Sequence, residues 1–294
     1  MTEIDPPDYR GAALPALIFG SVLWGLSWLP LKYVNSLGVA GVSLVLVAYG
    51  VAAMLTLPWL WRQRRFWAGR GVWLLTIAVI GGYANLAFTL ALIHGQVVRV
   101  MVLFYLLPVW GALGGWLVLR EQIDRLRLIA VAAALVGAFL ILGGPSALDG
   151  RFSWIDFLAI TSGLTFALSN LLYRARQEIP IASKMSATFG GGALLAMATL
   201  ALLPGFAIAN APALGWSLAA LYGGIWLMAA MGSSYWGVTH MEVGRSSVII
   251  ILELLTAVIS AVVLGGERMS PIELAGGALI LTAAFLEARR PVAR

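Results

Sequence analysis

The sequence predicts an all-α integral membrane protein in which ten transmembrane helices form two inverted five-helix repeats around a central cavity. The composition, a succession of long apolar runs and an internal duplication predict this fold. Hydrophobic residues make up 61% of the 294 residues and charged residues 11%, and the mean hydropathy is +0.93. Such a chain cannot cover itself with a mostly polar surface, so we expect it to lie in a lipid bilayer.

Apolar runs of about 20 residues, the length that a helix needs to cross about 30 Å of hydrocarbon, follow one another along the chain. Five precede the segment Gly143-Gly144-Pro145 and five follow it. The expected spans are 12–33, 38–61, 71–93, 96–118, 126–143, 153–173, 184–204, 214–237, 246–264 and 271–288. The corresponding parts are a cytoplasmic N-terminal segment 1–11, a first repeat 12–143, a linker 144–152, a second repeat 153–288 and a cytoplasmic C-terminal tail 289–294.

The two halves of the chain share a sequence pattern at a fixed offset. Shifting the sequence by 146 positions pairs Arg99 with Arg245, Glu121 with Glu267, Gly111 with Ala257 and Gly115 with Ala261. Small residues four positions apart let membrane helices approach closely. Since each repeat has an odd number of helices, the second repeat enters the membrane from the opposite side. Inverted repeats of this kind are typical of secondary transporters.

The basic residues predict that both termini are cytoplasmic. In that orientation only four of the 19 Lys and Arg residues lie outside, namely Lys32, Arg99, Arg151 and Arg268. This distribution satisfies the positive-inside rule. The net charge of +6 therefore reflects topology and contact with anionic lipid, and no nucleic-acid partner is expected because the basic residues are scattered over short loops. The expected location is the bacterial inner (cytoplasmic) membrane.

Aromatic and amide side chains in the first three helices are the first candidates for a binding cavity. Trp24 lies near the centre of the first helix, and Trp28 shares its face nearer the membrane interface. An interfacial anchor is the alternative interpretation of both. The second helix is assigned to lipid contact and packing. Tyr83 and Asn85 follow two glycines in the third helix, and we expect both to face the cavity unless interhelical hydrogen bonding alone explains them.

The fourth helix combines candidate wall residues with a helix-breaking proline. Met101, Tyr105 and Pro108 are spaced i, i+4, i+7 and therefore share one face. Pro108 removes a backbone hydrogen bond, so we expect a kink around Tyr105 that serves as a hinge for alternating access or as a fixed bend. The charged turn that follows contains Glu121, and it is expected to be a solvated corner with mutual pairing.

The second repeat adds aromatic and amide candidates. Phe166 and Asn170 accompany a row of hydroxyl side chains in the sixth helix. Trp226 and Tyr235 belong to an aromatic eighth helix, in which stacking surfaces beside small polar groups suit an amphipathic organic ligand. An aromatic belt at the membrane interface is the alternative for this helix.

Glu253 is the only acidic residue deep inside an expected span. An acid at mid-membrane costs about 2.5–3.5 kcal/mol on insertion scales, so it is expected to face the interior of the bundle. Ser246 and Ser260 lie seven positions to either side and form a polar stripe with it. Three roles stay open for Glu253: binding a substrate ammonium, carrying a coupling proton, or remaining protonated as a structural group.

Four short motifs resemble one family of membrane proteins. They are Leu23-Trp24-Gly25, Leu106-Leu107-Pro108, the Glu121 corner and Glu267. Over nearly its whole length the chain resembles the ten-helix EamA-type exporters of the drug/metabolite transporter superfamily, and its order of aromatic residues is similar to that of aromatic amino-acid exporters. The resemblance implies an export carrier whose central cavity is lined by helices one, three, four, six, eight and nine. Leu254 stands where Pro108 would recur, which argues against an equal hinge in both halves.

Together, these observations predict a membrane carrier that exports amino acids, aromatic and other neutral ones, from the cytoplasm by alternating access of the two repeats. The expected substrate-binding residues are Trp24, Tyr83, Asn85, Met101, Tyr105, Phe166, Asn170, Trp226, Tyr235 and Glu253, with Pro108 as the hinge. The alternative is a drug or metabolite efflux carrier of the same superfamily with non-amino-acid substrates.

An integral membrane enzyme is a distant alternative. The chain has no cysteine, and it contains neither a His-Glu-x-x-His motif nor a nucleotide-binding Gly-x-x-x-x-Gly-Lys-Ser/Thr loop. No cofactor or metal is expected. Proton coupling stays open, and the sequence does not predict whether the chain is a monomer or a homo-oligomer.

Overall fold

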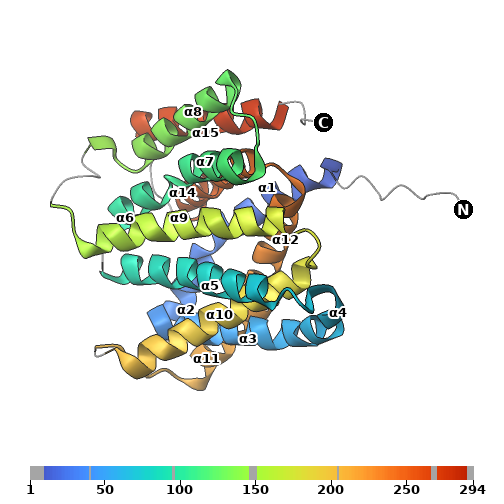
Figure 1. The fold of residues 1–294 in the computed structure, drawn as a ribbon. Helices are drawn as coiled ribbons and strands as arrows, with labels where there is room; N and C mark the ends of the chain where they lie inside the picture. Colours follow the sequence, from blue (N-terminus) through green and yellow to red (C-terminus); the bar gives the residue numbers. More distant parts are fainter. Residues whose placement is uncertain are drawn as a thin grey trace, which may run out of the picture.

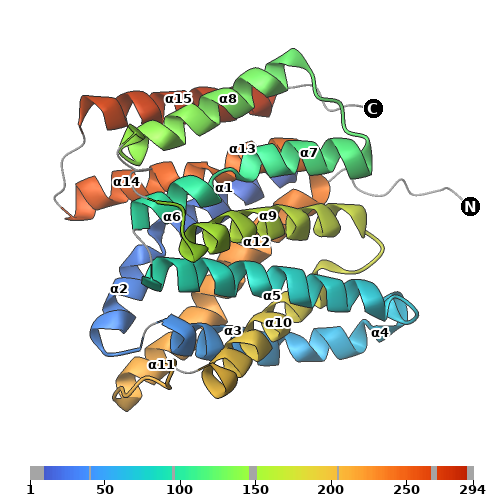
Figure 2. The ribbon, with the colours of Figure 1, turned by 60° about the vertical axis from the view of Figure 1, so that its left-hand side comes forward.

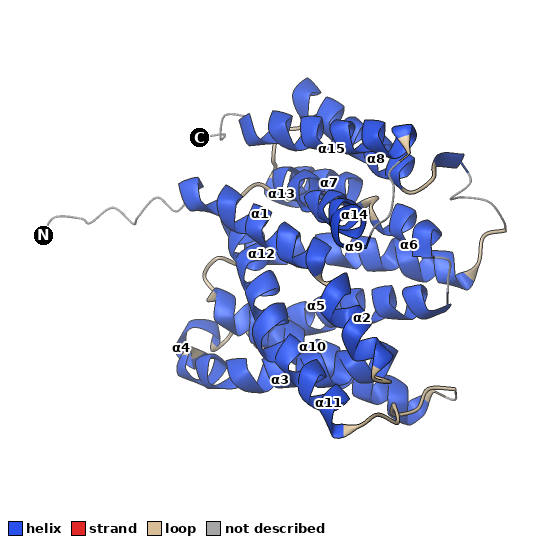
Figure 3. Ribbon diagram, turned by 180° about the vertical axis from the view of Figure 1, so that it is seen from behind, coloured by secondary structure: helices blue, strands red, loops and turns tan. Residues whose placement is uncertain are grey.

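Helices account for the regular secondary structure of the described residues. The computed structural model describes residues 10–39, 41–94, 97–145, 151–203, 205–265 and 270–289, and these ranges contain no strand (Figure 3). Nine helical segments among them are long and apolar enough to cross a membrane, and α8 (Arg125–Ile141), with 17 residues, supplies a shorter tenth. The predicted all-α, ten-helix membrane fold is confirmed. Glu267 lies outside the described residues.

The transmembrane segments of the first repeat, which we call crossings, consist of the helices α1 to α8 (Figure 1). The first crossing is interrupted at Ser27, between α1 and α2, and the fourth is interrupted at Tyr105 and Leu106, between α6 and α7. The bounds are α1 Arg10–Leu26, α2 Trp28–Ser36, α3 Gly41–Arg62, α4 Arg64–Trp67, α5 Gly71–His94, α6 Val97–Phe104 and α7 Leu107–Leu119, followed by α8.

The second repeat forms its crossings from α9 to α15. The eighth crossing contains a π-helix, η2, between α11 and α12, and the ninth is interrupted at Ile251, between α13 and α14. The bounds are α9 Trp154–Ala175, α10 Ile181–Leu202, α11 Ala213–Leu221, η2 Tyr222–Leu227, α12 Met228–His240, α13 Val243–Ile250, α14 Leu252–Gly265 and α15 Pro271–Arg289.

The two ends of the helical bundle can be named by the helices that begin or end there. The helix α1 begins, and α15 ends, at the same end of the bundle, where α4 also lies (Figures 1 and 2). We call this end the terminus face. The other end, where α2 turns into α3, is the opposite face. This arrangement defines the membrane normal, because the crossings run between these two faces.

Large apolar side chains cover the outside of the bundle. Leu55, Leu75, Trp116, Phe157 and Leu281 are all exposed. In a membrane these side chains face hydrocarbon, while the helices satisfy their backbone groups internally. The exposed apolar surface therefore agrees with a chain that spans the bilayer.

The first helix of each repeat packs across the interrupted fourth crossing of the other repeat. The helix α1 packs against α13 and α14, and α9 packs against α6 and α7 (Figure 2). The contacts are close enough to require glycine. A Cβ atom at Gly25 would lie 2.5 Å from the backbone oxygen of Glu253, and one at Gly163 would lie 2.6 Å from that of Phe104. The two repeats are therefore interleaved at the two breaks.

The break in the fourth crossing has a counterpart in the ninth, although only the fourth contains a proline there. Tyr105 and Ile251 lie 146 positions apart, which is the offset of the duplication. At each break the backbone tightens, since Leu106 N donates to Leu103 O and Ile251 N to Val248 O. The backbone is therefore interrupted at equivalent positions in both halves, and whether both breaks act as hinges stays a prediction.

Candidate functional site

A narrow cavity lies at the interface of the two repeats. It is lined by Ser21, Trp24, Phe166, Asn170, Met231, Ser234, Tyr235, Val238, Ile250 and Glu253, and its volume is about 10 Å³. A space of that size holds about one water molecule. The lining comes from α1 of the first repeat and from α9, α12, α13 and α14 of the second. In this state the molecule is nearly closed at its centre.

Tyr105 and Glu253 connect the two broken crossings. The Tyr105 hydroxyl donates a hydrogen bond of 2.9 Å to Glu253 Oε1. Tyr105 is 4% exposed and stands at the first break, while Glu253 lies in the first turn of α14, just after the second. A carboxylate in the first turn of a helix is favoured by the helix dipole. This bond therefore joins two positions at which the backbone is already irregular.

Buried polar atoms without hydrogen-bond partners gather near the narrow cavity. Asn170 Nδ2, Tyr235 Oη and Ser169 Oγ make no hydrogen bond of ordinary length and angle with another described group, and all three residues are at most 2% exposed. Leaving such a group unsatisfied costs about 1–3 kcal/mol. The Tyr235 ring is held by stacking on Tyr173, with a centroid separation of 3.9 Å. Asn170 and Tyr235 line the narrow cavity and are therefore positioned to bind a water molecule or a polar ligand.

A wider cavity of about 550 Å³ lies on the side of the opposite face. Aromatic rings share its wall with aliphatic side chains, and Lys32 is the one charged residue among the described residues that line it. Trp24 lines both this cavity and the narrow one. The wall consists of Trp24, Trp28, Leu31, Lys32, Asn35, Val39, Gly41, Leu44, Val45, Ala48, Tyr49, Asn85, Phe88, Thr89, Tyr222 and Leu227.

Asn85 and Tyr83 both take part in interhelical hydrogen bonds. Tyr49 Oη donates to Asn85 Oδ1 at 2.5 Å, and Asn85 Nδ2 donates to the Gly81 carbonyl at 2.7 Å. Asn85 thus lines the wider cavity while linking α5 to α3. The Tyr83 hydroxyl lies 3.0 Å from Thr161 Oγ1 on α9, and Tyr83 lines neither of these two cavities.

The second helix was expected to serve only lipid contact and packing, and this expectation is wrong for Tyr49. Tyr49 is 6% exposed and lines the wider cavity while bonding to Asn85. A tyrosine in the middle of an apolar span was the signal in the sequence, because a buried hydroxyl needs a partner.

Trp226 forms hydrogen bonds with polar groups at the break in the first crossing. Its Nε1 donates to Ser27 Oγ at 2.8 Å and to the Leu23 carbonyl at 3.2 Å. Irregular backbone survives at membrane depth where protein groups satisfy it, and π-helices such as η2 occur often at functional sites. Trp226 lies within η2, so the two irregular segments bond to each other.

The candidates therefore fall into three groups. Trp24, Phe166, Asn170, Tyr235 and Glu253 line the narrow cavity, and Tyr105 joins them through its bond to Glu253. Asn85 belongs to the wider cavity. Tyr83, Met101 and Trp226 line neither. Met101 packs against the hydrophobic cluster that contains Phe104 and Tyr105, and Trp226 bonds to the first crossing. Pro108 is buried in the first turn of α7, where a proline is tolerated.

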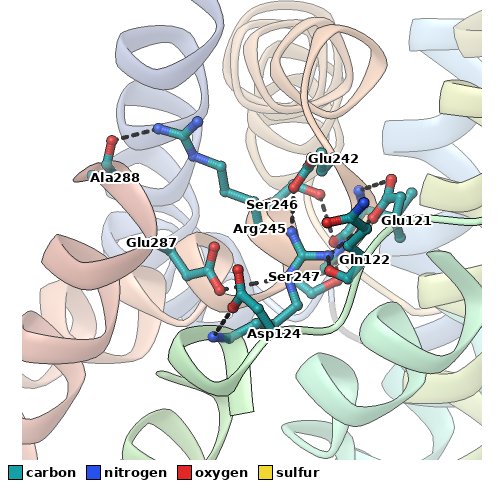
Figure 4. A network of polar contacts seen from close by, with 12 residues as sticks. Glu121, Gln122, Asp124, Glu242, Arg245, Ser246, Ser247, Glu287 and Ala288 are labelled. Atoms are coloured by element: carbon teal, nitrogen blue, oxygen red, sulfur yellow. Dashed lines mark hydrogen bonds and ion pairs between the residues drawn. The ribbon is translucent and has the colours of Figure 1, made fainter. Parts of the chain in front are cut away.

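On the terminus face, the Glu121 corner docks on the second repeat (Figure 4). Glu121 accepts hydrogen bonds from the backbone N–H groups of Val243 at 2.8 Å and Gly244 at 3.2 Å, the first two residues of α13. Burial raises the pKa of the Glu121 carboxyl above its usual value, although these N–H groups and Arg127 act in the lowering direction. The corner was expected to be solvated. Arg120, Asp124 and Arg125 are exposed as expected, but the Glu121 side chain is 8% exposed, so the expectation is wrong for Glu121.

Arg127 gathers carboxylates from three parts of the chain. Its guanidinium is fully buried and lies 3.4 Å from Glu121 and 3.6 Å from Glu287, and it also bonds to Glu242. Glu242 precedes α13, and Glu287 lies on α15. Asp124 accepts from Arg127 N at 2.8 Å and caps α8. One buried cation therefore ties the first repeat to the second at this face. No motif or spacing in the sequence predicts that these residues form ion pairs.

On the opposite face, a smaller ion pair also links the repeats. Arg99 on α6 donates to both carboxylate oxygens of Asp156 on α9, at 2.6 and 3.0 Å. Asp156 is 2% exposed, and its carboxylate also accepts from the Ser153 N–H in a capping box. The capping box is readable from the sequence, whereas the pairing with Arg99 is not.

Comparisons with known proteins agree with this architecture. The EamA-like transporter family model matches residues 12–143 and again residues 153–288. A solved structure, described as a crystal structure of a protein, is similar with a TM-score of 0.76 and 16% identity, over 94% of this chain and 96% of that one. At this identity the likeness concerns the fold. No curated protein matches the chain significantly.

The family match occurs once in each half and covers most of the sequence. It points to transport rather than to enzymatic chemistry, and to a small-molecule substrate handled within the lipid bilayer. The chain belongs to the EamA-like transporter family, within the drug/metabolite transporter superfamily.

Proposed function

We propose that this transporter exports amino acids, aromatic and other neutral ones, by alternating access of its two repeats. The observation that carries the proposal is the position of Trp24, which lines both a narrow cavity that contains polar side chains and a wider cavity that contains aromatic rings. An amphipathic solute needs both environments, because its polar head seeks hydrogen bonds and its side chain seeks apolar contact.

The polar groups of the narrow cavity suit the head group of an amino acid. The Glu253 carboxylate is an acceptor that can bind an ammonium group. Asn170 Nδ2 is a buried donor without a hydrogen bond of ordinary geometry, and the Tyr235 hydroxyl, which lies near Ser169 and Thr188, is a second donor. Both can bind a carboxylate. Aromatic rings in the wider cavity, such as Trp28 and Phe88, would then contact the side chain. The narrow cavity must expand to hold such a head group.

Alternating access would part the contacts of one face while the other stays closed. The Arg127 cluster holds the repeats together at the terminus face, and the Arg99–Asp156 pair holds them at the opposite face. The breaks at Tyr105 and Ile251 are the positions at which α6 and α13 can pivot. We propose that the terminus face is cytoplasmic, in a bacterial inner membrane, so that export runs from the Arg127 cluster towards the wider cavity.

Flux of radiolabelled phenylalanine and tryptophan in proteoliposomes tests this function. We expect saturable flux that other neutral amino acids compete for, and a loss of about tenfold or more for Glu253→Gln if the carboxylate binds the ammonium. Glu273→Gln is the matched control, since Glu273 is a half-buried carboxylate in the first turn of α15 that accepts from Ser270 N and lines neither cavity. Absence of flux for every amino acid in well-folded protein would exclude this substrate class.

Comparison of flux with and without an imposed pH gradient decides whether a proton is coupled. Acceleration by the gradient that disappears in Glu253→Gln would assign the coupling proton to this carboxyl. Flux that follows the substrate gradient alone would leave Glu253 as a substrate-binding or structural group.

The second candidate is efflux of drugs or metabolites that are not amino acids. The wider cavity favours it, since about 550 Å³ falls within the range of pockets for drug-sized ligands. A competition panel of aromatic cations, aromatic acids and amino acids separates the two candidates. Competition by aromatic compounds without an α-amino acid group would favour this second function.

A further inference from the structure

A groove on the outside of the bundle runs between α1 and α15. These helices form its walls, and α13 and α14 form its floor, because both pack against α1 and α15. Its volume is about 480 Å³. The lining residues are Leu14, Ile18, Ile249, Leu252, Leu281, Thr282, Ala284, Phe285 and Ala288.

The chemistry of the groove is that of hydrocarbon. Its one polar side chain, Thr282, donates its hydroxyl hydrogen to the Ala278 carbonyl of the same helix at 2.8 Å. Ile18, Leu281 and Phe285 are exposed at the edges, so the groove is open towards the bilayer. Water has no partners in such a space, and an apolar chain therefore occupies it more favourably than water does.

The extent of the groove places it in one leaflet. Along α15 it reaches from Leu281 to Ala288, which is about 10 Å at 1.5 Å per residue, and Ala288 is next to the last described residue of the helix. The hydrocarbon core is about 30 Å thick. The groove therefore occupies part of the leaflet beside the terminus face.

A cation stands where the groove meets the membrane surface. The Arg289 guanidinium lies 4.2 Å from the centroid of the Phe285 ring, which lines the groove. Arg289 is exposed, and the sequence continues with Arg290 and Arg294. Basic residues at a membrane surface attract anionic lipid head groups. An apolar groove beside a surface cation is complementary to a phospholipid with an acyl chain and a negatively charged head group.

We propose that this groove is a binding site for one anionic phospholipid, with an acyl chain between α1 and α15 and the head group against Arg289. The lipid would contact Ile249 and Leu252, which flank the break at Ile251. It would also lie against Ala288, whose carbonyl accepts a hydrogen bond of 2.6 Å from Arg245. The bound lipid would thus stabilise the ninth crossing around its break at Ile251. This site is independent of the proposed substrate.

Native mass spectrometry of the full chain, delipidated and then incubated with phosphatidylglycerol or phosphatidylcholine of identical acyl chains, tests the site. We expect the wild-type protein to retain one phosphatidylglycerol in preference to phosphatidylcholine. Arg289→Gln should reduce this preference about fivefold, the effect of one basic residue at an anionic surface. Arg64→Gln is the matched control, because Arg64 also stacks over an exposed ring, Trp61, at 4.9 Å, but that ring does not line the groove.

A second pair of variants tests the acyl chain. Ile18→Trp fills the groove from α1 and should reduce retention of both lipids, whereas Leu274→Trp, at an exposed position of α15 outside the groove, should not. Phe285→Leu keeps the groove apolar but removes the stacking, so it should lower the preference and keep retention. Size-exclusion profiles establish that each variant is folded.

Three results would overturn the proposal. They are equal retention of both lipids by the wild type, an equal loss in Arg64→Gln and Arg289→Gln, and undiminished retention in folded Ile18→Trp. A dimer that Ile18→Trp abolishes, with no lipid retained by the wild type, would instead assign the groove to a second copy of the chain.

Discussion

The two interrupted crossings, α6–α7 in the first repeat and α13–α14 in the second, occupy equivalent positions but carry different side chains. The breaks lie at Tyr105–Leu106 and at Ile251, and a proline follows only the first. Both are crossed by the first helix of the other repeat, through Gly163 and Gly25. The break therefore accompanies the crossing helix rather than the proline. The side chains beside it have diverged, so that one crossing supplies a phenol and the other a carboxylate.

The outer ends of the two crossings differ as well. The start of α13 is held by Glu121 and by the fully buried Arg127, while α6 is held by Arg99, whose side chain is 14% exposed. Burial strengthens an ion pair electrostatically and also raises the cost of losing one partner. The terminus face should therefore be more sensitive to the loss of its cation than the opposite face.

The largest expected effect is that of Arg127→Met. It leaves Glu121, Glu242 and Glu287 without their shared cation, so the free energy of unfolding should fall by about 3–5 kcal/mol. Arg99→Met, the comparison variant at the other face, should cost less because Arg99 is partly exposed. Unfolding by sodium dodecyl sulfate in mixed micelles measures both. Equal losses would show that the two faces are not different in this respect.

The crossing glycines should show the next largest effect. Gly25→Ala and Gly163→Ala each place a methyl group against backbone, and we expect a loss of about 1–3 kcal/mol of unfolding free energy for each. Gly190→Ala is the control, because a Cβ there has no heavy atom within 4 Å, and it should be neutral or slightly stabilising. If only one of the two crossing variants is destabilised, the two breaks are not supported in the same way.

Coupling between Tyr105 and Glu253 should be smaller. A double-mutant cycle of Tyr105→Phe and Glu253→Gln, measured as flux in proteoliposomes, should give an interaction energy on the order of 1 kcal/mol. The expectation follows from the hydrogen bond between the two side chains, which are 148 positions apart. Additive effects would mean that this bond does not contribute to transport. Tyr83→Phe is a control, since Tyr83 bonds to Thr161 elsewhere.

The smallest effect on stability is expected at Leu254, the position at which the second repeat lacks the proline of the first. Leu254→Pro recreates the proline of the first repeat in the first turn of α14. A first helical turn tolerates the ring, but the change removes the hydrogen bond of 3.0 Å from Leu254 N to Ile251 O, so the unfolding free energy should fall by about 1 kcal/mol. Ala257→Pro, further inside α14, should cost about 3 kcal/mol. A severe loss for Leu254→Pro would restore the proline as the cause of the first break.

Much of the fold could be predicted from the sequence, because each crossing carries its own signal. The length of the apolar runs located the crossings, and the shared offset of Arg99 and Arg245 indicated two repeats. The kink near Tyr105 followed from Pro108. The break at Ile251 did not, because it contains neither glycine nor proline. The packing of α1 against α13 and α14 accompanies it in the folded molecule.

The candidate site could be predicted only in part. Trp24, Phe166, Asn170, Tyr235 and Glu253 were chosen for their polarity or aromatic rings at membrane depth, and they line one cavity. Tyr83 and Trp226 satisfied the same criterion and lie elsewhere. Helical periodicity tells which residues share a face, but it does not tell which neighbouring helix covers that face.

The sequence by itself determined the membrane environment, the number of crossings and the duplication, because these depend on composition and on local order along the chain. Only the tertiary structure decided which polar groups meet. Glu121 reaches Val243 across 122 positions, and Trp226 reaches Ser27 across 199. Nine helical segments among the described residues are apolar enough to cross a membrane, so apolarity alone does not select a partner. Partners are therefore selected by close packing and by buried polar groups that must be satisfied, and both depend on the assembled bundle.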